Sequence, residues 1–124
     1  GSIGLHTTVE DMLKYLRYHL DESNRIVKAS HQAFFDTPYH FSIGYYWNIL
    51  RKGNTMVYRH HGGIYGMQNW LIIYPEHQLG LSILTNVSFQ DTSEILEKVA
   101  EEICHQIIKN QPQERDIRKD DGKK

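Results

Sequence analysis

Two runs in the second half of the chain, Gln68-Asn-Trp-Leu-Ile-Ile-Tyr74 and Leu79-Gly-Leu-Ser-Ile-Leu-Thr85, decide the fold class. Both runs are rich in the aliphatic and aromatic residues that favour strands, and only Pro75-Glu-His-Gln78 lies between them. A connection this short joins antiparallel neighbours. The apolar residues form near-continuous runs, which is typical of strands that are covered on both faces.

Two further strands are expected upstream of this pair. Ser42 to Leu50 is rich in aromatic and β-branched residues, and Lys52-Gly-Asn54 is a turn signal. Thr55 to His60 is therefore predicted to be the returning strand of a hairpin. Together with the first pair, these segments predict four antiparallel strands.

The N-terminal part of the chain has the periodicity of helices. One helix is expected from Thr7 to Leu20, because Thr7 and Glu10 have the spacing of a capping box. A second, shorter helix is expected around Ala29 to Phe35, ending before Pro38. The apolar stripe of the first helix is predicted to consist of Val9, Met12, Leu13, Leu16 and Leu20.

A long helix is expected near the C-terminus, from Thr92 to about Lys109, with Asp91 and Glu94 as a capping pair. The only cysteine, Cys104, lies on its apolar side and is predicted to be a buried small hydrophobe. The apolar face of this helix is predicted to consist of Ile95, Leu96, Val99, Ile103 and Ile107.

This order of elements predicts an α+β fold: a four-stranded antiparallel sheet flanked by an N-terminal helix and a long C-terminal helix. Two helices can cover one face of four strands, so the second face is expected to need cover from elsewhere. The domain is expected to span residues 1–110. Residues 111–124 are strongly charged and are expected to form a disordered tail.

Composition narrows the class of function. The hydrophobic fraction is 40% and the formal net charge is −1, so the chain can form a core but does not attract nucleic acid through its charge. No apolar run approaches the roughly 20 residues that cross a bilayer, so no membrane span is expected. A single cysteine excludes an internal disulfide and a cysteine-based zinc site.

The segment that could carry chemistry is His60-His-Gly-Gly-Ile-Tyr-Gly-Met67. It is a strand that ends in paired histidines, followed by glycines that leave backbone N–H groups accessible. Such a strand edge can bind an oxyanion or pair with an extended substrate backbone. The structural alternative is that the glycines simply form a turn.

The surrounding sequence resembles the serine β-lactamase and penicillin-binding-protein-like hydrolases, of the type related to class C β-lactamases. The similarity covers residues 1–110 in the expected order. His60-His-Gly62 resembles the His-x-Gly form of the family's Lys-Thr-Gly motif, and Gly63-Ile-Tyr-Gly66 continues it. The other similar segments are Ser2 to Met12, Phe41-Ser-Ile-Gly-Tyr-Tyr-Trp47, Tyr74-Pro-Glu76 and Leu79 to Asn86.

The resemblance implies a role for each residue of the motif. His60 takes the basic position and Gly63 supplies an oxyanion-hole N–H, which makes these the two expected catalytic residues. His61 takes the hydroxyl-bearing position and Gly62 gives close approach, as expected for substrate binding. His61 departs from the family's usual Thr or Ser, which affects recognition of a substrate carboxylate.

The family's nucleophile is not found in this sequence. In the family a serine attacks an acyl carbon and a lysine three residues later helps to activate it. None of the serines has a lysine three positions later. Tyr46-Trp-Asn48 has the spacing of the family's Tyr-x-Asn motif but lies inside a predicted strand, and we interpret it as a coincidence.

The sequence therefore predicts the C-terminal portion of a serine acyl-hydrolase acting on β-lactams, D-amino-acid peptides or esters, inactive alone. Its expected partners are the missing N-terminal part of the same fold, a small-molecule or peptide substrate, and a second copy through exposed apolar surface. A periplasmic or secreted parent and no cofactor or metal are expected. The alternative is a stand-alone, non-catalytic binding module that uses the glycine-flanked strand edge.

Overall fold

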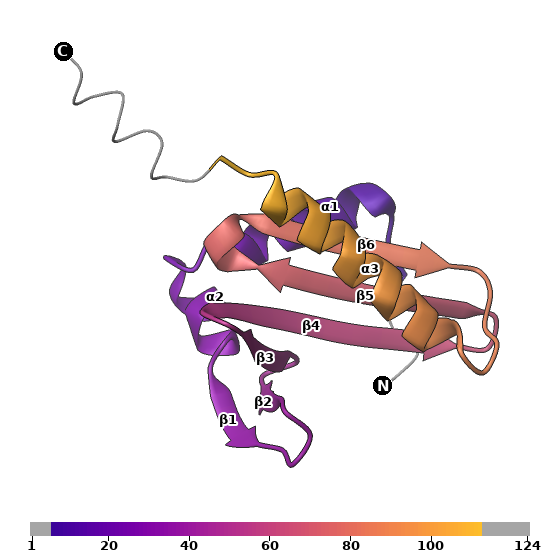
Figure 1. Ribbon diagram of the computed structural model, residues 1–124, viewed down its shortest axis with the longest axis horizontal. Helices are drawn as coiled ribbons and strands as arrows, with labels where there is room; N and C mark the ends of the chain where they lie inside the picture. The colour runs from indigo at the N-terminus through magenta and orange to yellow at the C-terminus, as the bar shows by residue number, and fades with distance from the viewer. Residues whose placement is uncertain (1–5, 113–124) are drawn as a thin grey trace.

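The computed structural model describes residues 6–112, which form one antiparallel sheet with helices on both faces (Figure 1). The sheet has six strands in the order β1-β2-β3-β4-β5-β6, so each strand pairs with its neighbours in sequence. The strands are β1 (Ala33–Asp36), β2 (Ser42–Gly44), β3 (Asn48–Lys52), β4 (Thr55–Ile64), β5 (Met67–Tyr74) and β6 (Leu79–Thr85). The helices are α1 (Val9–Leu20), α2 (Arg25–Ser30), the short 3₁₀ helix η1 (Pro75–His77) and α3 (Thr92–Lys109).

The α+β class and the antiparallel sheet are confirmed, and so are strands β5 and β6 and helix α3. Helix α1 is confirmed, but its cap is Thr8 rather than Thr7: the Thr8 side chain accepts a hydrogen bond from the Asp11 N–H. At α3, Asp91 occupies the cap position without a side-chain hydrogen bond to the helix, so the predicted capping pair is wrong. The tail predicted for residues 111–124 lies outside the described residues, except for residues 111–112.

The prediction of four strands is wrong, because the sheet has six. The segment predicted as a short helix around Ala29 to Phe35 divides into the end of α2 and strand β1. The segment predicted as one strand from Ser42 to Leu50 divides into β2 and β3, which pair with each other.

The division between β2 and β3 begins at Gly44. A Cβ atom at this position would lie 2.8 Å from the Gln32 carbonyl oxygen and 2.8 Å from Ile49 Cδ1, so only glycine fits there without displacement. The Gly44 N–H then donates to the Trp47 carbonyl at 2.9 Å, which closes the turn. Tyr46, inside this turn, has a φ of 72°.

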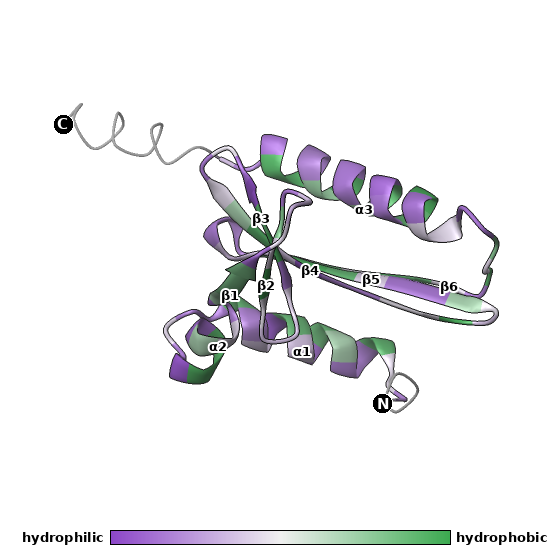
Figure 2. Ribbon diagram, turned by 90° about the horizontal axis from the view of Figure 1, so that it is seen from below, coloured by the Kyte–Doolittle hydropathy of each residue, from purple (hydrophilic) through white to green (hydrophobic). Residues whose placement is uncertain are grey.

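The two long helices lie on opposite faces of the sheet, and α2 lies on the same side as α1 (Figure 2). On the α1 face, Leu16 packs with Trp47, Ile49, Tyr58, Leu71 and Ile73. On the α3 face, Ala100 and Cys104 pack with Val57, Trp70, Ile72 and Tyr74. The expectation that both helices cover one face is therefore wrong. Alternate residues of β4 and β5 supply the two cores, because successive side chains of a strand point to opposite faces.

Helix α3 buries a narrower apolar stripe than the sequence predicts. Ala100 and Cys104 face the sheet, and burial raises the pKa of the Cys104 thiol to about 11, which confirms that it is a buried small hydrophobe. Four of the five residues predicted for the buried face are exposed: Ile95, Val99, Ile103 and Ile107. They form a continuous apolar row along the helix, since they follow one another at intervals of four residues.

This apolar row lies on the side of α3 toward β6. Arg59 of β4 pairs with Glu97 and Glu101, which places that side of the helix over β4. With 100° per residue, Val99 and Ile103 then lie on the opposite side of the helix axis. Within the described residues, β6 pairs only with β5, so the row runs above the open edge of β6.

Each of the two faces should contribute to stability. Ile72 and Ile73 are neighbours on β5 that are fully buried against α3 and α1 respectively. We expect Ile72→Val and Ile73→Val each to lower the free energy of unfolding by about 0.5–1.5 kcal/mol, measured by urea denaturation. Ile95→Val on the exposed row is the control and should change it by less than about 0.5 kcal/mol. A neutral result at Ile72 or Ile73 would show that its face is not covered in solution.

Candidate functional site

The predicted motif lies in the second half of β4. Along one edge, β4 pairs with β5 from Tyr58 to Ile64. Along the other edge, it pairs with β3 only from Thr55 to Arg59, because β3 begins at Asn48, opposite Arg59. The residues from His60 to Ile64 therefore have an open edge on the β3 side. The glycines Gly62 and Gly63 are part of the strand, and the chain turns only at Tyr65 and Gly66.

The direction of each backbone N–H follows from the pairing. Ile64 and Met67 flank the two-residue turn, so they form a hydrogen-bonded pair, and even-numbered residues of β4 bond to β5. Odd-numbered residues then point their N–H and C=O groups toward the β3 side. Beyond Arg59, no strand of the described chain pairs with these groups. His61 and Gly63 therefore present their backbone to the open edge, as an oxyanion donor must.

The side chains of the two histidines lie on opposite faces of the sheet. His60 shares the α1 face with Tyr58, and His61 shares the α3 face with Val57. The His60 imidazole stacks on the Tyr46 ring, with ring centroids 4.0 Å apart and planes parallel to within 1°. Burial, and in second place the neighbouring His61, lowers the pKa of His60 below its ordinary value.

His61 is held in a polar network on the α3 face. Its Nε2 atom lies 2.6 Å from Gln68 Oε1 and 3.1 Å from Ser93 Oγ, and Gln68 Nε2 donates to Ser88 Oγ at 2.9 Å. Since the Gln68 oxygen is an acceptor, the His61 Nε2 atom carries the proton. Trp70 Nε1–H donates to the Ser93 carbonyl at 3.0 Å, so the network ties the start of α3 to the sheet.

Gly63 makes room for this network. A Cβ atom at Gly63 would lie 2.7 Å from Gln68 Cδ, because the Gln68 side chain crosses directly over the glycine. A Cβ atom at Gly62 would meet the Asn69 side chain at 3.0 Å, which is a tight but milder contact. The glycine pair therefore allows side chains of β5 to lie across both faces of β4.

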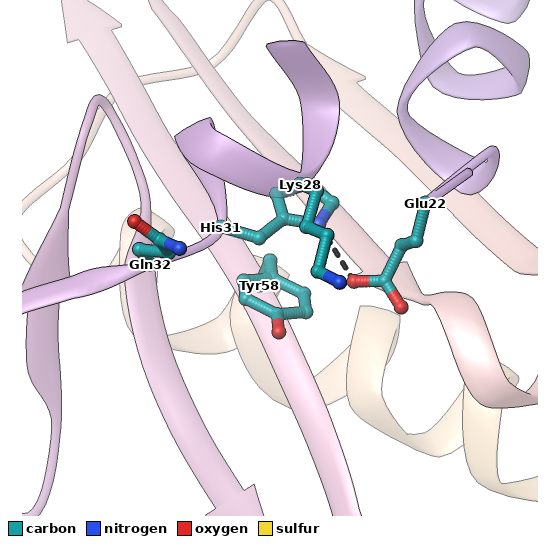
Figure 3. A pocket seen from close by; sticks show the side chains of 5 residues that line it. All are labelled: Glu22, Lys28, His31, Gln32 and Tyr58. Carbon is teal, nitrogen blue, oxygen red and sulfur yellow. Dashed lines mark hydrogen bonds and ion pairs between the residues drawn. The ribbon is translucent and has the colours of Figure 1, made fainter. Parts of the chain in front are cut away.

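A separate hollow of about 340 Å³ lies on the α2 side of the sheet and is lined by Glu22, Lys28, His31, Gln32 and Tyr58 (Figure 3). Glu22 accepts a hydrogen bond from His31 Nδ1 at 2.9 Å, and the His31 ring stacks on Tyr58 at 4.1 Å. Burial, followed by the carboxylates of Glu22 and Glu76, raises the pKa of Tyr58 to about 12. The Tyr58 hydroxyl is therefore protonated and does not give the hollow an ionised nucleophile or base. The open edge of β4 remains the better candidate for the functional site.

His19 belongs to the same aromatic cluster and is buried, 7% exposed, against Trp47 and Tyr15. Its ring centroid lies 5.6 Å from that of His31. Burial, and in second place the charge of His31, lowers the pKa of His19 to about 4. The Nδ1 atom of His19 is buried without a hydrogen-bond partner, which is consistent with a neutral ring.

Other chemistry has little support in residues 6–112. No group of three or more His, Cys, Asp or Glu side chains in this range could hold a metal ion. No helix within it is long and apolar enough to cross a membrane. The acidic face of α3 is only partly solvated, because Glu97 pairs with Arg59 and Glu101 with Lys52 at 2.6 Å.

The sequence did not reveal the side chains that surround the motif. Tyr46 was interpreted as part of a continuous strand, and its position over His60 depends on the turn that begins at Gly44. The partners of His61, Gln68 and Ser93, come from β5 and α3. A sequence signal existed for Gln68 only, since a polar residue opens the apolar run of β5.

The sequence matches the model of a known protein family. The sequence model described as Beta-lactamase matches residues 1–102, which include the whole of β4 and most of α3. A search of curated proteins found no similar sequence.

The glycine pair provides a test of the His61 network. In Gly63→Ala, the new methyl group should displace Gln68 and break its bonds to His61 and Ser88, which should cost about 1–3 kcal/mol of unfolding free energy. Gly62→Ala is the matched control with the smaller expected loss. The His61 ring signals should move in Gly63→Ala and stay in place in Gly62→Ala when both are recorded by NMR. Equal effects of the two substitutions would contradict this account.

The buried His19 predicts a pH dependence of stability. The pKa of His19 is about 4 in the folded chain and about 6.5 when unfolded, so the unfolded chain binds more protons between these values. The contribution of His19 to the free energy of unfolding is fully present above pH 6.5, and it is lost as the pH falls to about 4. Urea denaturation of His19→Phe between pH 7 and pH 4 should show a shallower fall than the parent chain. Parallel curves would show that His19 does not titrate in this way.

Proposed function

Because the chain belongs to the Beta-lactamase family, we propose that it is the C-terminal portion of a serine acyl-hydrolase and forms one wall of the active site. The observation that carries the proposal is the open edge of β4, where no strand in the described part of the chain pairs with the backbone of His61 and Gly63 on the β3 side. A backbone N–H on such an edge is fixed in direction by the sheet. It can therefore stabilise a developing negative charge without reorganisation.

Each residue of the motif has a role in this wall. The Gly63 N–H donates to the acyl oxygen as the attacking serine turns it into an oxyanion, and His60 supplies the titratable side chain beside it. His61 binds substrate through its backbone, since its ring is engaged with Gln68 and Ser93. Gly62 leaves space on the face that His60 occupies, where the Asn69 side chain lies across it, so a substrate that approaches there also meets Asn69.

The nucleophile comes from outside this sequence. No serine of the chain has a lysine three residues later, so the Ser-x-x-Lys pair belongs to the missing N-terminal part of the same fold. The open edge of β6 is where that part docks. Exposed apolar side chains flank this edge on both faces: Val99 and Ile103 from α3, Val9 and Leu13 from α1, and Leu84 of β6 itself. Strands added at this edge would be buried on both sides, as expected inside a larger domain.

A binding function without catalysis is the second candidate, and the same edge of β4 supports it. An extended peptide could pair with His61 and Gly63 by strand addition, using main-chain hydrogen bonds alone. This function needs no serine nucleophile. It predicts saturable binding of a peptide by the isolated chain.

Covalent labelling separates the two functions. The chain alone, incubated with a β-lactam or a fluorophosphonate, should gain no mass in intact-mass spectrometry. Expressed together with the upstream part of its own protein, it should yield an acyl adduct on a serine of that part. An adduct on a serine of the chain itself would overturn the assignment of the nucleophile, and peptide binding without any adduct would favour the binding module.

The same assay tests His60. In the completed protein, His60→Ala should slow acylation by about 10²–10⁴-fold, the range for loss of a general acid or base. His105→Ala, on the exposed side of α3, is the matched control and should leave the rate unchanged. Equal rates in the two variants would remove His60 from the catalytic machinery.

A further inference from the structure

The turn between β2 and β3 contains a strained residue that the core does not explain. Tyr46 has a φ of 72°, a left-handed conformation that is rare for residues with a bulky side chain. Such strain persists only where surrounding contacts enforce it, and it concentrates at functional sites. The Tyr46 side chain is 58% exposed, so the strain is not offset by burial of its ring in the core.

The strained conformation places the Tyr46 ring over His60. The two rings are parallel to within 1° with centroids 4.0 Å apart, whereas the next residue, Trp47, turns into the core and is 1% exposed. His60 is the first residue of β4 beyond the end of its pairing with β3. The stack therefore covers the imidazole at the point where the open edge begins.

We propose that Tyr46 is a positioning residue, whose ring fixes the plane of the His60 imidazole at the open edge of β4. A face-to-face stack restricts rotation about the last side-chain torsion of the histidine, which is otherwise broad. Since the ring nitrogens lie at the rim of the imidazole, a stack on its face does not cover them. This proposal depends on the proposed function in one respect, which is that His60 takes part in the reaction.

The electrostatics of His60 agree with this arrangement. Burial is the main cause that lowers its pKa, and the Tyr46 ring excludes water from one face of the imidazole. The adjacent His61 acts in the same direction. A stacked, neutral imidazole can accept a proton at neutral pH, which a fixed cation at this position cannot do.

Two substitutions separate positioning from a structural role. Tyr46→Gly removes the ring and relieves the strain, since glycine adopts a positive φ readily, so it should leave thermal stability unchanged or raised. Tyr46→Phe keeps both the ring and the strain. Both variants can be made in the chain as it stands, with the His60 signals identified by their loss in His60→Gln.

The readout is a histidine NMR titration. In the parent chain and in Tyr46→Phe, the ring protons of His60 should be shifted upfield by the stacked ring and should titrate below the ordinary pKa. In Tyr46→Gly, the upfield shift should be lost and the pKa of His60 should move up toward its ordinary value. The proposal is overturned if the His60 signals are the same in Tyr46→Gly as in the parent. A loss of folding in Tyr46→Gly but not in Tyr46→Phe also overturns it, because the turn would then depend on the ring.

This test is independent of the acyl-hydrolase assignment, because it needs no reaction. In the completed protein, Tyr46→Gly should shift the pH profile of acylation in the same direction as the pKa of His60. Completed protein that never acylates, with the stack intact by NMR, would refute the proposed function and leave the positioning of His60 standing.

Discussion

The end of β3 at Asn48 is the constraint on which the candidate site depends. As long as β3 runs beside β4, every backbone group of β4 is used within the sheet. Where β3 stops, the same alternation that built the sheet leaves the N–H groups of His61 and Gly63 without a strand partner among residues 6–112. Extending β3 by four residues toward its N-terminus would bring Tyr46 opposite His61 and Gly44 opposite Gly63, which would satisfy these groups and close the edge. The turn at Gly44–Trp47 prevents this by directing the chain into β2.

Successive side chains of a strand point to opposite faces of the sheet, so His60 and His61 have different surroundings. His60 lies on the α1 face beneath Tyr46, where the ring remains beside the open edge. His61 lies on the α3 face, and its ring connects β4 to Gln68 and to the first turn of α3. The His61 ring can stay bound to Ser93 of α3 while the His61 backbone binds a ligand at the open edge. The side chain at position 61 therefore ties β4 to α3, while its backbone still points to the open edge.

The sequence predicted the elements that contain long apolar runs, and it missed the short elements whose conformation depends on pairing with other strands. Strands β5 and β6 and helix α3 have enough residues for a clear pattern. Strands β1 and β2 have four and three residues, and their conformation depends on the neighbouring strands rather than on their own sequence. Apolar content placed Val99 and Ile103 in the core, but they are exposed, because Ala100 and Cys104 face the sheet instead. Glu97 and Glu101, on the other side of the helix, pair with Arg59 and Lys52. His60 to Gly63 were found as a motif, whereas the positive φ of Tyr46 has no signature in the sequence.

The open edges of β4 and β6 in the described part of the chain differ in what they can accept. The edge of β4 is bordered by imidazole and glycine, which leave the backbone accessible and offer polar groups to a ligand. The edge of β6 is bordered by the apolar row of α3 above and by Leu13 and Leu84 on the other face, so a polar ligand would gain little there. An added strand with apolar side chains on both faces would bury these residues and satisfy the backbone of β6 at once. The chemistry of the borders therefore supports the proposal that the edge of β4 faces the substrate and that the edge of β6 receives the rest of the fold.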